Sequence, residues 1–591
     1  MRVKLITKLA MAIAVSTAAS ASVALPASAA PGAAASSRHA APTGSAIAES
    51  ARAAALSHRV QAGLAAKSGL VASDVMVDAS GKQHVRFSQT YRGIPVEAAD
   101  IVVHLDAASR YLGVTRASAT VVSLPSVHAD VTEAQARGKA ASRVNRGVAG
   151  AAALVVNQDD GRSTLSYRVQ VVPSDGAIDR ARTVLVDAAS GAVLSSRPAA
   201  DGFISPQVYD KLRAAGEHAA PAPEAPGRAP AAPPSTSAAA AFPSPASGTG
   251  NSIFSGSVPL NTTQTGTSTF TLVDGTRGNS EVRDGRHTSS VSSTVFNTSS
   301  VLTDADNVWG NGSTTDNATP AVDAQYGLAS TYDFYKATFN RNGIANDGVG
   351  SHGVVHFSTN YGNAAWYDGC HCMLYGDGDG QTFTKPLVQL DVTGHELTHG
   401  VVSSTARLQP SSNAKIGNEP GALNESLADI FASGVEFGTA NPRNPGNYLV
   451  GEQLGLAQTF LRRLDHPSLD KLEGAIDYWS TTTPRTEVHA GSGVSSHAFY
   501  LLAEGSGSKT INGVAYNSPT VDGQSVTGIG RGAALAIFYQ ALTRYMVSTT
   551  NFHAARTATL NAAADLYGSG STQYNAVNRA WAAVNVTASN G

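Results

Sequence analysis

Two histidines four residues apart, His395 and His399, constrain the fold more than any other feature of the sequence. Residues with this spacing lie on one face of an α-helix, about 6 Å apart, so both imidazoles can bind one metal ion. Glu396 is one position further along and would lie beside that metal. The alternative is a helix that carries two unrelated histidines on an ordinary face. Under the first interpretation, the chain must place this helix next to a metal-binding cavity.

A second helix can supply the remaining ligand. The stretch 424–429 reads Asn-Glu-Ser-Leu-Ala-Asp, so Glu425 and Asp429 are one helical turn apart. Three protein ligands leave the fourth position of a tetrahedral zinc ion for water, which is typical of catalytic zinc sites. Asp429 would then accept from a ligand imidazole and fix the tautomer that binds the metal. A pair of solvated carboxylates is the alternative.

Further motifs follow around these residues in a fixed order. They are Asn-Tyr-Gly-Asn-Ala-Ala-Trp at 360–366, Tyr-Gly-Asp-Gly-Asp-Gly-Gln-Thr-Phe at 375–383, Val-His-Ala-Gly-Ser-Gly at 488–493 and Gly-Ile-Gly-Arg at 528–531. With this set, the sequence from about Gly248 to the C-terminus resembles the thermolysin-like metallopeptidases. Upstream, Arg-Gly-Ile-Pro-Val at 92–96 resembles the fungalysin/thermolysin propeptide, and residues 130–195 resemble a PepSY module.

The resemblance implies an α+β fold. A two-lobed peptidase domain, with a β-rich N-terminal lobe and a helical C-terminal lobe, would follow an α+β propeptide. Alanine- and proline-rich composition predicts a semi-extended linker, and an Ala-, Ser- and Gly-rich stretch before the propeptide is expected to be poorly ordered. The expected divisions are a signal peptide at 1–29, a disordered start at 30–57, the propeptide at 58–125, the PepSY-like module at 126–200, the linker at 201–247, the N-terminal lobe with the zinc helix at 248–399 and the helical lobe at 400–591.

The resemblance also implies roles for particular residues. One zinc ion per chain would be bound by His395, His399 and Glu425, with Glu396 as the general base and Asp429 behind a ligand. The residues expected to meet the substrate are Asn363 and Ala364 for its backbone, Arg462 for its carbonyl and His489 for the oxyanion. An arginine offers a planar fork of donors, and a histidine can donate to developing negative charge. Taken alone, each of these residues would be an ordinary surface residue.

Calcium is the second metal that the resemblance implies. The residues at or near family calcium positions are Asp391, Glu436, Asn444, Asn447 and Glu452. Oxygen ligands suit this hard cation. Asn447 replaces the usual Asp and Leu449 a frequent Glu, so one calcium is expected rather than a pair. Asp304 and Asp306 would either bind another calcium or form a solvated turn.

The sequence departs from the family pattern beside the expected oxyanion site. No Tyr occurs between His399 and Glu425, where a Tyr hydroxyl normally donates to the oxyanion; Pro410 or Ile416 falls near that position, next to an insertion at 410–415. Pro484 replaces the Asp that supports the oxyanion histidine, and Glu487 is a candidate substitute. The sequence therefore leaves open what completes this part of the site.

The first residues predict export. Arg2, Lys4 and Lys8 precede an apolar stretch at 9–25, and small residues around Ala29 are typical of a signal-peptide cleavage site. A transmembrane anchor is the alternative, but Ser, Thr and Pro26 interrupt the stretch. We expect a secreted, extracellular protein.

Composition narrows the partners. Charged residues make up 15% of the chain and the formal charge is −2, which favours neither nucleic acid nor an anionic membrane as a partner. The two cysteines, Cys370 and Cys372, would form a local disulfide or remain paired thiols without a catalytic role. We expect a monomer whose partners are protein and peptide substrates and its own propeptide, acting as inhibitor and chaperone.

Together these features predict a zinc-dependent neutral endopeptidase made as a zymogen. Its mature N-terminus should fall between about residues 201 and 250. Cleavage should precede bulky apolar residues, because apolar side chains would line the pocket for the residue after the cut bond. The expected pocket residues are Phe383, Val392, Val450, Leu454 and Leu461. One alternative is a zinc-binding homologue with weak or lost activity. Another makes residues 58–200 the functional part, as a free inhibitor or chaperone.

Overall fold

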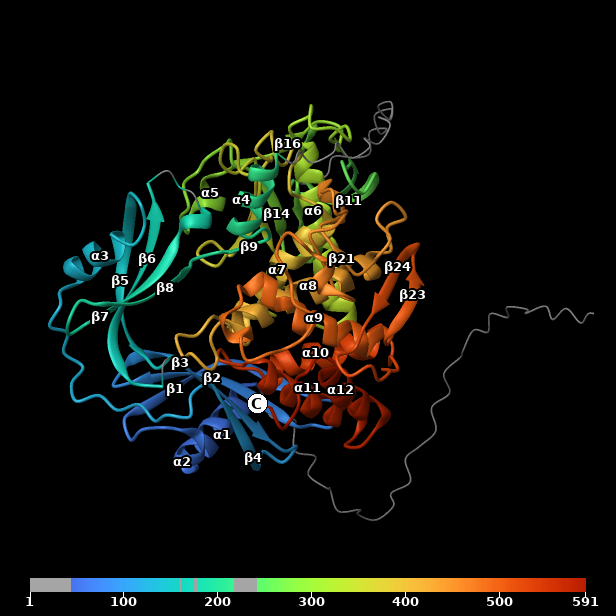
Figure 1. Cartoon of the computed structure of the whole chain (residues 1–591). Coiled ribbons are helices and arrows are strands. Elements are labelled where there is room, and N and C mark those ends of the chain that lie inside the picture. The colour runs from blue at the N-terminus through green and yellow to red at the C-terminus, as the bar shows by residue number, and fades with distance from the viewer. Residues whose placement is uncertain (1–43, 160, 175, 177, 217–241, 591) are drawn as a thin grey trace, which may run out of the picture. The chain divides into compact units, whose positions relative to one another are not determined.

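The computed structural model describes residues 44–159, 161–174, 176, 178–216 and 242–590. The expected signal peptide and the middle of the expected linker lie outside these residues. Within the described part, an N-terminal α+β module is followed by a β-rich lobe and then a helical lobe (Figure 1). This order of elements confirms the predicted fold class.

A mixed eight-stranded sheet forms the N-terminal module. Its order is β1-β2-β3-β5-β6-β7-β8, with β4 paired to β3; the β3–β5 pair is parallel and the others are antiparallel. The strands are β1 (Ser68–Val77), β2 (Gln83–Tyr91), β3 (Ile94–Leu105), β4 (Tyr111–Arg116), β5 (Gly147–Asn157), β6 (Thr164–Pro173), β7 (Arg182–Asp187) and β8 (Val193–Pro198), and the helices are α1 (Gly44–Ser57), α2 (Arg59–Ala62) and α3 (Glu133–Ala141). The pairing of β3 with β5 joins the predicted 58–125 and 126–200 units into one sheet.

The prediction that 30–57 is poorly ordered is wrong for residues 44–57. They form α1, which buries Ile47, Ala48, Ala51 and Ala55. These positions recur at helical spacing and pack in one apolar cluster with strand residues such as Phe87. Alanine content alone suggested disorder, whereas the periodic burial of small side chains against the sheet stabilises a helix.

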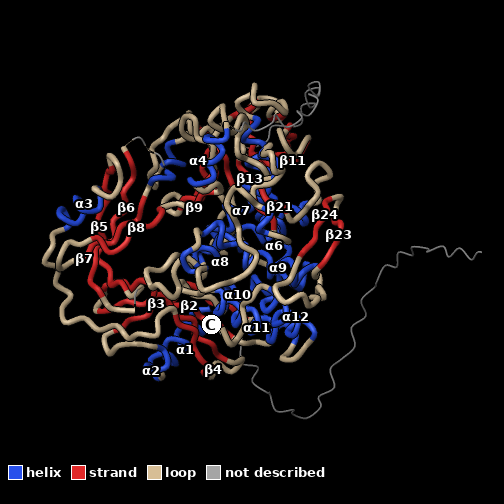
Figure 2. The backbone as a smooth tube through the Cα atoms, in the orientation of Figure 1, coloured by secondary structure: helices blue, strands red, loops and turns tan. Residues whose placement is uncertain are grey.

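Two further sheets build the β-rich lobe (Figure 2). One has the order β16-β12-β11-β10-β17, and the other β13-β14-β18-β20-β19-β9, with β15 paired to β14. The strands are β10 (Ser244–Asn251), β11 (Ser257–Gly266), β12 (Thr269–Thr271), β13 (Val273–Asp274), β14 (Ser280–Asp284), β15 (Ser300–Val301), β16 (Thr303–Asp304), β17 (Val308–Trp309), β18 (His352–Val355), β19 (Ala364–Tyr367) and β20 (Cys372–Tyr375), with helices α5 (Val295–Thr298) and α6 (Thr319–Phe339).

The helical lobe follows, and its first helices form the core. The helices are α7 (Leu390–Ser404), α8 (Glu419–Thr439), α9 (Val488–Glu504), α10 (Arg531–Arg544), α11 (Phe552–Tyr567) and α12 (Thr572–Ala583), and the short strands are β21 (Leu449–Val450), β22 (Arg462–Arg463), β23 (Gly507–Ile511) and β24 (Val514–Ser518). Single 3₁₀ turns lie at Ile178–Arg180, Gly275–Arg277, Glu452–Leu454, Pro467–Leu469 and Thr483–Arg485. Helix α7 is buried from Leu390 to Val402 and packs against α8. The expected boundary at 399 therefore falls inside a core helix.

The ends of the predicted 201–247 linker are ordered, which corrects that prediction at both boundaries. β9 (Asp201–Gly202) pairs with β19, α4 spans Pro206–Ala215, and β10 already begins at Ser244. Ser205 caps α4 by accepting from Val208 N, and Val208 and Leu212 are buried. A capping serine and an apolar i, i+4 pair outweigh the Ala/Pro-rich composition of the neighbouring residues.

One buried arginine of the N-terminal module donates hydrogen bonds to carbonyl groups at the end of a helix in the helical lobe. Arg86 on β2 donates through Nη2 to the carbonyls of Thr543 at 3.1 Å and Met546 at 2.8 Å, just at and beyond the C-terminus of α10. Helix C-termini carry unpaired carbonyls and a partial negative charge, so a cation there is favourable. Nearby, Ser548 Oγ donates to Asp100. These contacts attach the module to the helical lobe.

Two histidines beside this contact predict a loss of stability in acid. His84 and His104 join through their Nδ1 atoms at 2.9 Å, and burial lowers the pKa of each to about 3. A pKa below the usual 6.5 means that the folded chain resists protonation, so this stability is complete above pH 6.5 and is lost as the pH falls towards 3. The charged and titratable groups around the pair are Asp78, Lys82, Arg86, Arg544, Tyr545 and Asp565.

We expect the free energy of unfolding to fall by about 1.4 kcal/mol per pH unit for each of the two histidines across that range. Unfolding measured at pH 7.0, 6.0 and 5.0 checks this. The double variant His84→Gln/His104→Gln is the control. Its free energy of unfolding should depend less steeply on pH, because the two titrating imidazoles are gone while the neighbouring carboxylates remain in place. Equal slopes for the two proteins would contradict the assignment.

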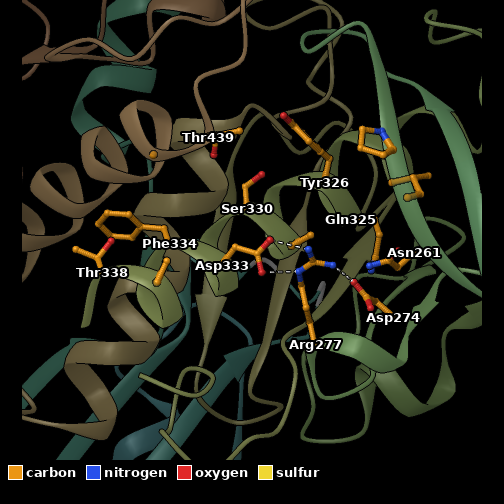
Figure 3. Close-up of a pocket in the computed structure, with 15 residues that line it drawn as sticks. Asn261, Asp274, Arg277, Gln325, Tyr326, Ser330, Asp333, Phe334, Thr338 and Thr439 are labelled. Atoms are coloured by element: carbon orange, nitrogen blue, oxygen red, sulfur yellow. Dashed lines mark hydrogen bonds and ion pairs between the residues drawn. The ribbon is translucent and has the colours of Figure 1, made fainter. Parts of the chain in front are cut away.

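Among the described residues, no helix is both long and apolar enough to cross a membrane. Cys370 and Cys372 form a disulfide, which agrees with the local pairing that the sequence favoured. A cavity of about 460 Å³ lies between β11, α6 and the end of α8 (Figure 3). Among the described residues that line it, Arg277 is the one cation, and it is paired with both Asp274 and Asp333, so no unpaired cation faces an anionic ligand there.

Candidate metal centre and substrate cleft

The three expected zinc ligands converge on one buried point. His395 and His399 lie on α7, and their Nε2 atoms are 3.0 Å apart. Glu425 on α8 places Oε2 3.4 Å from the first and 3.7 Å from the second. A tetrahedral zinc with bonds of 2.0–2.1 Å would separate two ligand nitrogens by about 3.3 Å. The spacing of the imidazoles therefore suits a single zinc ion.

The outer nitrogens of both imidazoles have acceptors that fix the tautomer. His395 Nδ1 donates to Asp429 Oδ1 at 2.7 Å, and His399 Nδ1 donates to Asn424 Oδ1 at 3.1 Å. Both Nε2 atoms are left with a free lone pair towards the metal position. Arg462 holds Asp429 through Nε and Nη2, each at 2.9 Å. Burial alone would raise the pKa of Asp429, but Arg462 and His395 lower it to about 2.

Two buried carboxylate oxygens test whether the site suits a cation. Among the described residues, Glu396 Oε1 and Glu425 Oε2 have no hydrogen-bond donor, although neither is reached by solvent. The other oxygen of Glu396 accepts from Trp366 N at 2.7 Å, which holds the carboxylate in place. Burial raises the pKa of Glu396 well above its usual value. Two unsatisfied carboxylate oxygens beside two imidazole lone pairs are the donor set that a divalent zinc ion and its water would complete.

His489 begins α9 beside this centre. Its Nδ1 donates to Glu487 Oε1 at 2.9 Å, and Glu487 Oε2 accepts from the backbone of His489 at 2.8 Å. Burial would lower the pKa of His489, but the carboxylates of Glu425, Glu487 and Glu473 raise it well above its usual value. Both ring nitrogens are therefore donors. Glu487, the candidate substitute for the Asp that Pro484 replaces, thus contacts both the ring and the backbone of His489.

The remaining substrate-site residues all contact one segment of the chain, residues 201–204. Asn363 exchanges two hydrogen bonds with Ile204, each at 3.0 Å, and Ala364 O accepts from Phe203 N at 3.1 Å. Arg462 Nη1 donates to Phe203 O at 2.9 Å, and His489 Nε2 donates to Gly202 O at 3.1 Å. The structure thus brings the four predicted residues together around a peptide.

The expected calcium residues also lie together. Asp391, Glu436 and Glu452 converge, and Glu452 Oε2 is buried without a hydrogen-bond donor among the described residues. Asn444 donates to Glu436 at 2.9 Å and Asn447 donates to Glu452 at 2.8 Å. Burial and the neighbouring carboxylates raise the pKa of Glu436 well above its usual value and that of Glu452 to about 8. A hard divalent cation suits this donor set.

Neither candidate position for the absent Tyr supplies a hydroxyl. Ile416 donates its backbone N–H to Asn413 O, and Pro410 presents its carbonyl to Arg197 at 3.5 Å. The inserted loop instead contacts the N-terminal module, where Ser412 N donates to Asp159 at 2.7 Å. At the other calcium candidate, Asp304 accepts from the backbone of its own turn.

Three residues of the site were missed from the sequence. Asn424 supports His399, Glu473 accepts from Ser205 and faces His489, and Asp201 places Oδ2 3.9 Å from His399 Nδ1. Asn424 precedes Glu425 on α8, and that adjacency was an available signal. The other two residues reach the site only through tertiary folding, and no local pattern marks them.

Comparison with known proteins shows the family to which the chain belongs. Residues 247–403 match the family model described as thermolysin metallopeptidase, catalytic domain, and residues 412–586 match its alpha-helical domain. Together the two matches cover more than half of the chain. The chain belongs to the thermolysin family of metallopeptidases. Residues 68–118 match the fungalysin/thermolysin propeptide motif, so this thermolysin-family chain carries a propeptide within its N-terminal module.

Curated relatives agree with this assignment. A transglutaminase-activating metalloprotease from Streptomyces mobaraensis is 38% identical over 89% of this chain and 62% of its own length. A bacillolysin from Bacillus cereus is 40% identical over 57% of this chain and 55% of its own length. A thermolysin from Alicyclobacillus acidocaldarius subsp. acidocaldarius is 41% identical over 45% of each chain. The thermolysin-family chain thus spans less than two thirds of each of these relatives.

Proposed function

We propose that the protein is a secreted, zinc-dependent neutral endopeptidase made as a zymogen. The convergence of His395, His399 and Glu425 around a point that Glu396 also faces is the observation that carries this proposal. A protein that only binds zinc has no need of a buried, unpaired carboxylate oxygen beside the metal position. The propeptide would act as inhibitor and folding chaperone, and the mature enzyme as a monomer on protein and peptide substrates.

The roles of the side chains follow from their contacts. When bound, zinc supplies a Lewis acid and a polarised water. Glu396 accepts a proton from the attacking water and returns it to the leaving amine, because its free oxygen faces the site. His489 donates to the oxygen that becomes negatively charged, and Arg462 binds the next carbonyl along the substrate. No covalent intermediate with the protein is required.

Metal removal tests the proposal. On a casein gel, the secreted protein should digest the substrate. A zinc chelator should abolish this activity and added zinc should restore it, because the proposed reaction needs the ion that His395 and His399 bind. Digestion that resists the chelator would contradict a zinc mechanism. A folded, zinc-loaded wild type that leaves casein intact would favour the alternative, a zinc-binding homologue with weak or lost activity.

Cleavage is proposed to precede bulky apolar residues. Phe203 follows the carbonyl held by His489. Its side chain is fully buried, and its ring lies nearly perpendicular to that of His395 with the two centroids 5.1 Å apart. The expected pocket residues belong to the same buried apolar cluster as Phe203; they are Phe383, Val392, Val450, Leu454 and Leu461. No charged side chain belongs to that set. Arg462, whose guanidinium lies 5.0 Å from the Phe203 ring, is already paired with Asp429 through two hydrogen bonds, so the pocket favours neither acidic nor basic residues.

Peptide mapping checks this specificity. We expect cuts before Leu, Phe, Ile and Val, with a preference of roughly 1–3 kcal/mol per methylene-scale misfit. Leu454→Ala enlarges the pocket and should shift the preference towards larger side chains without removing activity. Mapping that placed most cuts after Arg or Lys would contradict the proposed pocket.

We also propose one calcium ion at Asp391, Glu436 and Glu452, with Asn444 and Asn447 beside them. Three carboxylates within one cluster, two of them buried and that of Glu452 partly buried, repel one another unless a cation or protons compensate their charge. Asp391 additionally accepts from Gly451 N at 2.6 Å, so the site joins α7 to the residue that follows β21, next to the proposed pocket residue Val450. Bound calcium would stabilise that junction.

A further inference from the structure

Residues 201–204 cross the catalytic cleft, and the first two of them form the strand β9. Gly202 pairs with Ala365 and Asp201 with Trp366, so β9 adds an antiparallel strand to the edge of the sheet at β19. Main-chain hydrogen bonds to a sheet edge are a common way for proteins to hold a peptide, with side-chain pockets supplying specificity. The segment therefore lies as a substrate would.

The carbonyl of Gly202 lies at the reacting position. It accepts from His489 Nε2 at 3.1 Å, and the same nitrogen is 3.5 Å from Glu425 Oε2. Glu425 Oε2 in turn faces both ligand imidazoles. The next carbonyl, of Phe203, is held by Arg462 at 2.9 Å. The bond between these two residues is thus the one flanked by the proposed oxyanion donor and the proposed carbonyl donor.

The side chain after that bond matches the proposed pocket. Phe203 is fully buried, lies edge-on to His395 and has the Arg462 guanidinium 5.0 Å above its ring. Downstream, Ser205 Oγ donates to Glu473 at 2.6 Å, and Tyr209 of α4 contacts Phe383 with ring centroids 5.8 Å apart. The chain is therefore anchored on the far side of the bond as well.

We propose that Gly202–Phe203 is the bond that the enzyme hydrolyses in its own chain to begin maturation. The inference rests on the proposed endopeptidase function. One water is consumed: its oxygen forms the new bond to the Gly202 carbonyl carbon, the bond to Phe203 N breaks, and Glu396 passes a proton to that nitrogen. The products are a Gly202 carboxylate and a Phe203 amine. Helix α4 then holds the new N-terminus at the cleft, downstream of the cut.

Terminal sequencing of the purified full chain tests the bond directly. The first processed form should begin at Phe203, and its partner fragment should end at Gly202. Phe203→Leu should be cut at the same position, whereas Phe203→Asp should slow this cut by roughly 10- to 200-fold, because it places a charge in an apolar pocket. A first cut at another bond in a protein that digests casein would overturn the inference and leave the proposed function standing.

Two further measurements separate folding from cleavage. A synthetic peptide of residues 197–207 needs no folding, and the mature enzyme should cut it between Gly and Phe; the same peptide with Asp at position 203 is the control. In the Glu396→Ala precursor, hydrogen exchange should be slow at the amides of Phe203 and Ile204, which donate to Ala364 and Asn363. Fast exchange of these two amides would show that the segment does not lie in the cleft and would overturn the inference. An intact wild type that also spares casein would contradict both proposals.

Discussion

Glu396→Ala should lower kcat/KM by about 10²- to 10⁴-fold, the range that a positioned general acid–base supplies. The three ligands do not depend on this side chain, so zinc content should stay at one ion per chain. The precursor should also accumulate uncut, because the same carboxylate serves both reactions. Casein digestion, zinc analysis and electrophoresis of the purified protein measure these three results. Full digestion by this variant would contradict the proposed mechanism.

A matched control removes a carboxylate outside the proposed site. Asp333 lines the cavity of Figure 3 and is half-exposed, and its partner Arg277 keeps Asp274 as a second carboxylate. Asp333→Asn should therefore digest casein and mature as the wild type does. A comparable loss in both variants would indicate damage to the fold rather than loss of the proton acceptor.

Helical spacing explains why the metal centre could be predicted from the sequence. His395 and His399 are four residues apart, as are Glu425 and Asp429, so each pair must share a face once its segment is helical. The structure confirms both helices and brings the four side chains together. Such local patterns survive folding because tertiary packing only has to set the distance between two helices.

Contacts between distant segments were beyond local reasoning. Arg86 meets carbonyls more than 450 positions away, and Glu473 meets Ser205 across 268 positions. Neither pair has a periodic or compositional signature in the sequence, because nothing near Arg86 or Glu473 indicates which distant segment each will contact. The same holds for α1, where alanine content gave no indication of which side chains a sheet would bury. The placement of Gly202 at the cleft also belongs to this class.

The second large effect concerns the oxyanion, where the family Tyr has no counterpart. His489 is held by Glu487, and the carboxylates of Glu425, Glu487 and Glu473 raise its pKa well above the usual value. Pro410 and Ile416 offer backbone groups but no hydroxyl near it. Among the residues described around Gly202 O, His489 is therefore the side chain positioned to donate.

Removing one such donor typically costs about 2.7–4 kcal/mol, so His489→Ala should lower kcat/KM by roughly 10²- to 10³-fold while folding and zinc content remain intact.

Glu487→Gln keeps a hydrogen-bond acceptor for His489 but removes the supporting charge, so the loss of kcat/KM should be smaller. The variant lowers the pKa of His489, so the alkaline limb of the pH profile should shift to lower pH. Ile416→Tyr or Pro410→Tyr should raise activity or leave it unchanged. Steady-state kinetics of these variants checks the assignment. If His489→Ala were nearly silent, the oxyanion role would have to be withdrawn. The zinc assignment would stand, because it rests on the convergence of His395, His399 and Glu425.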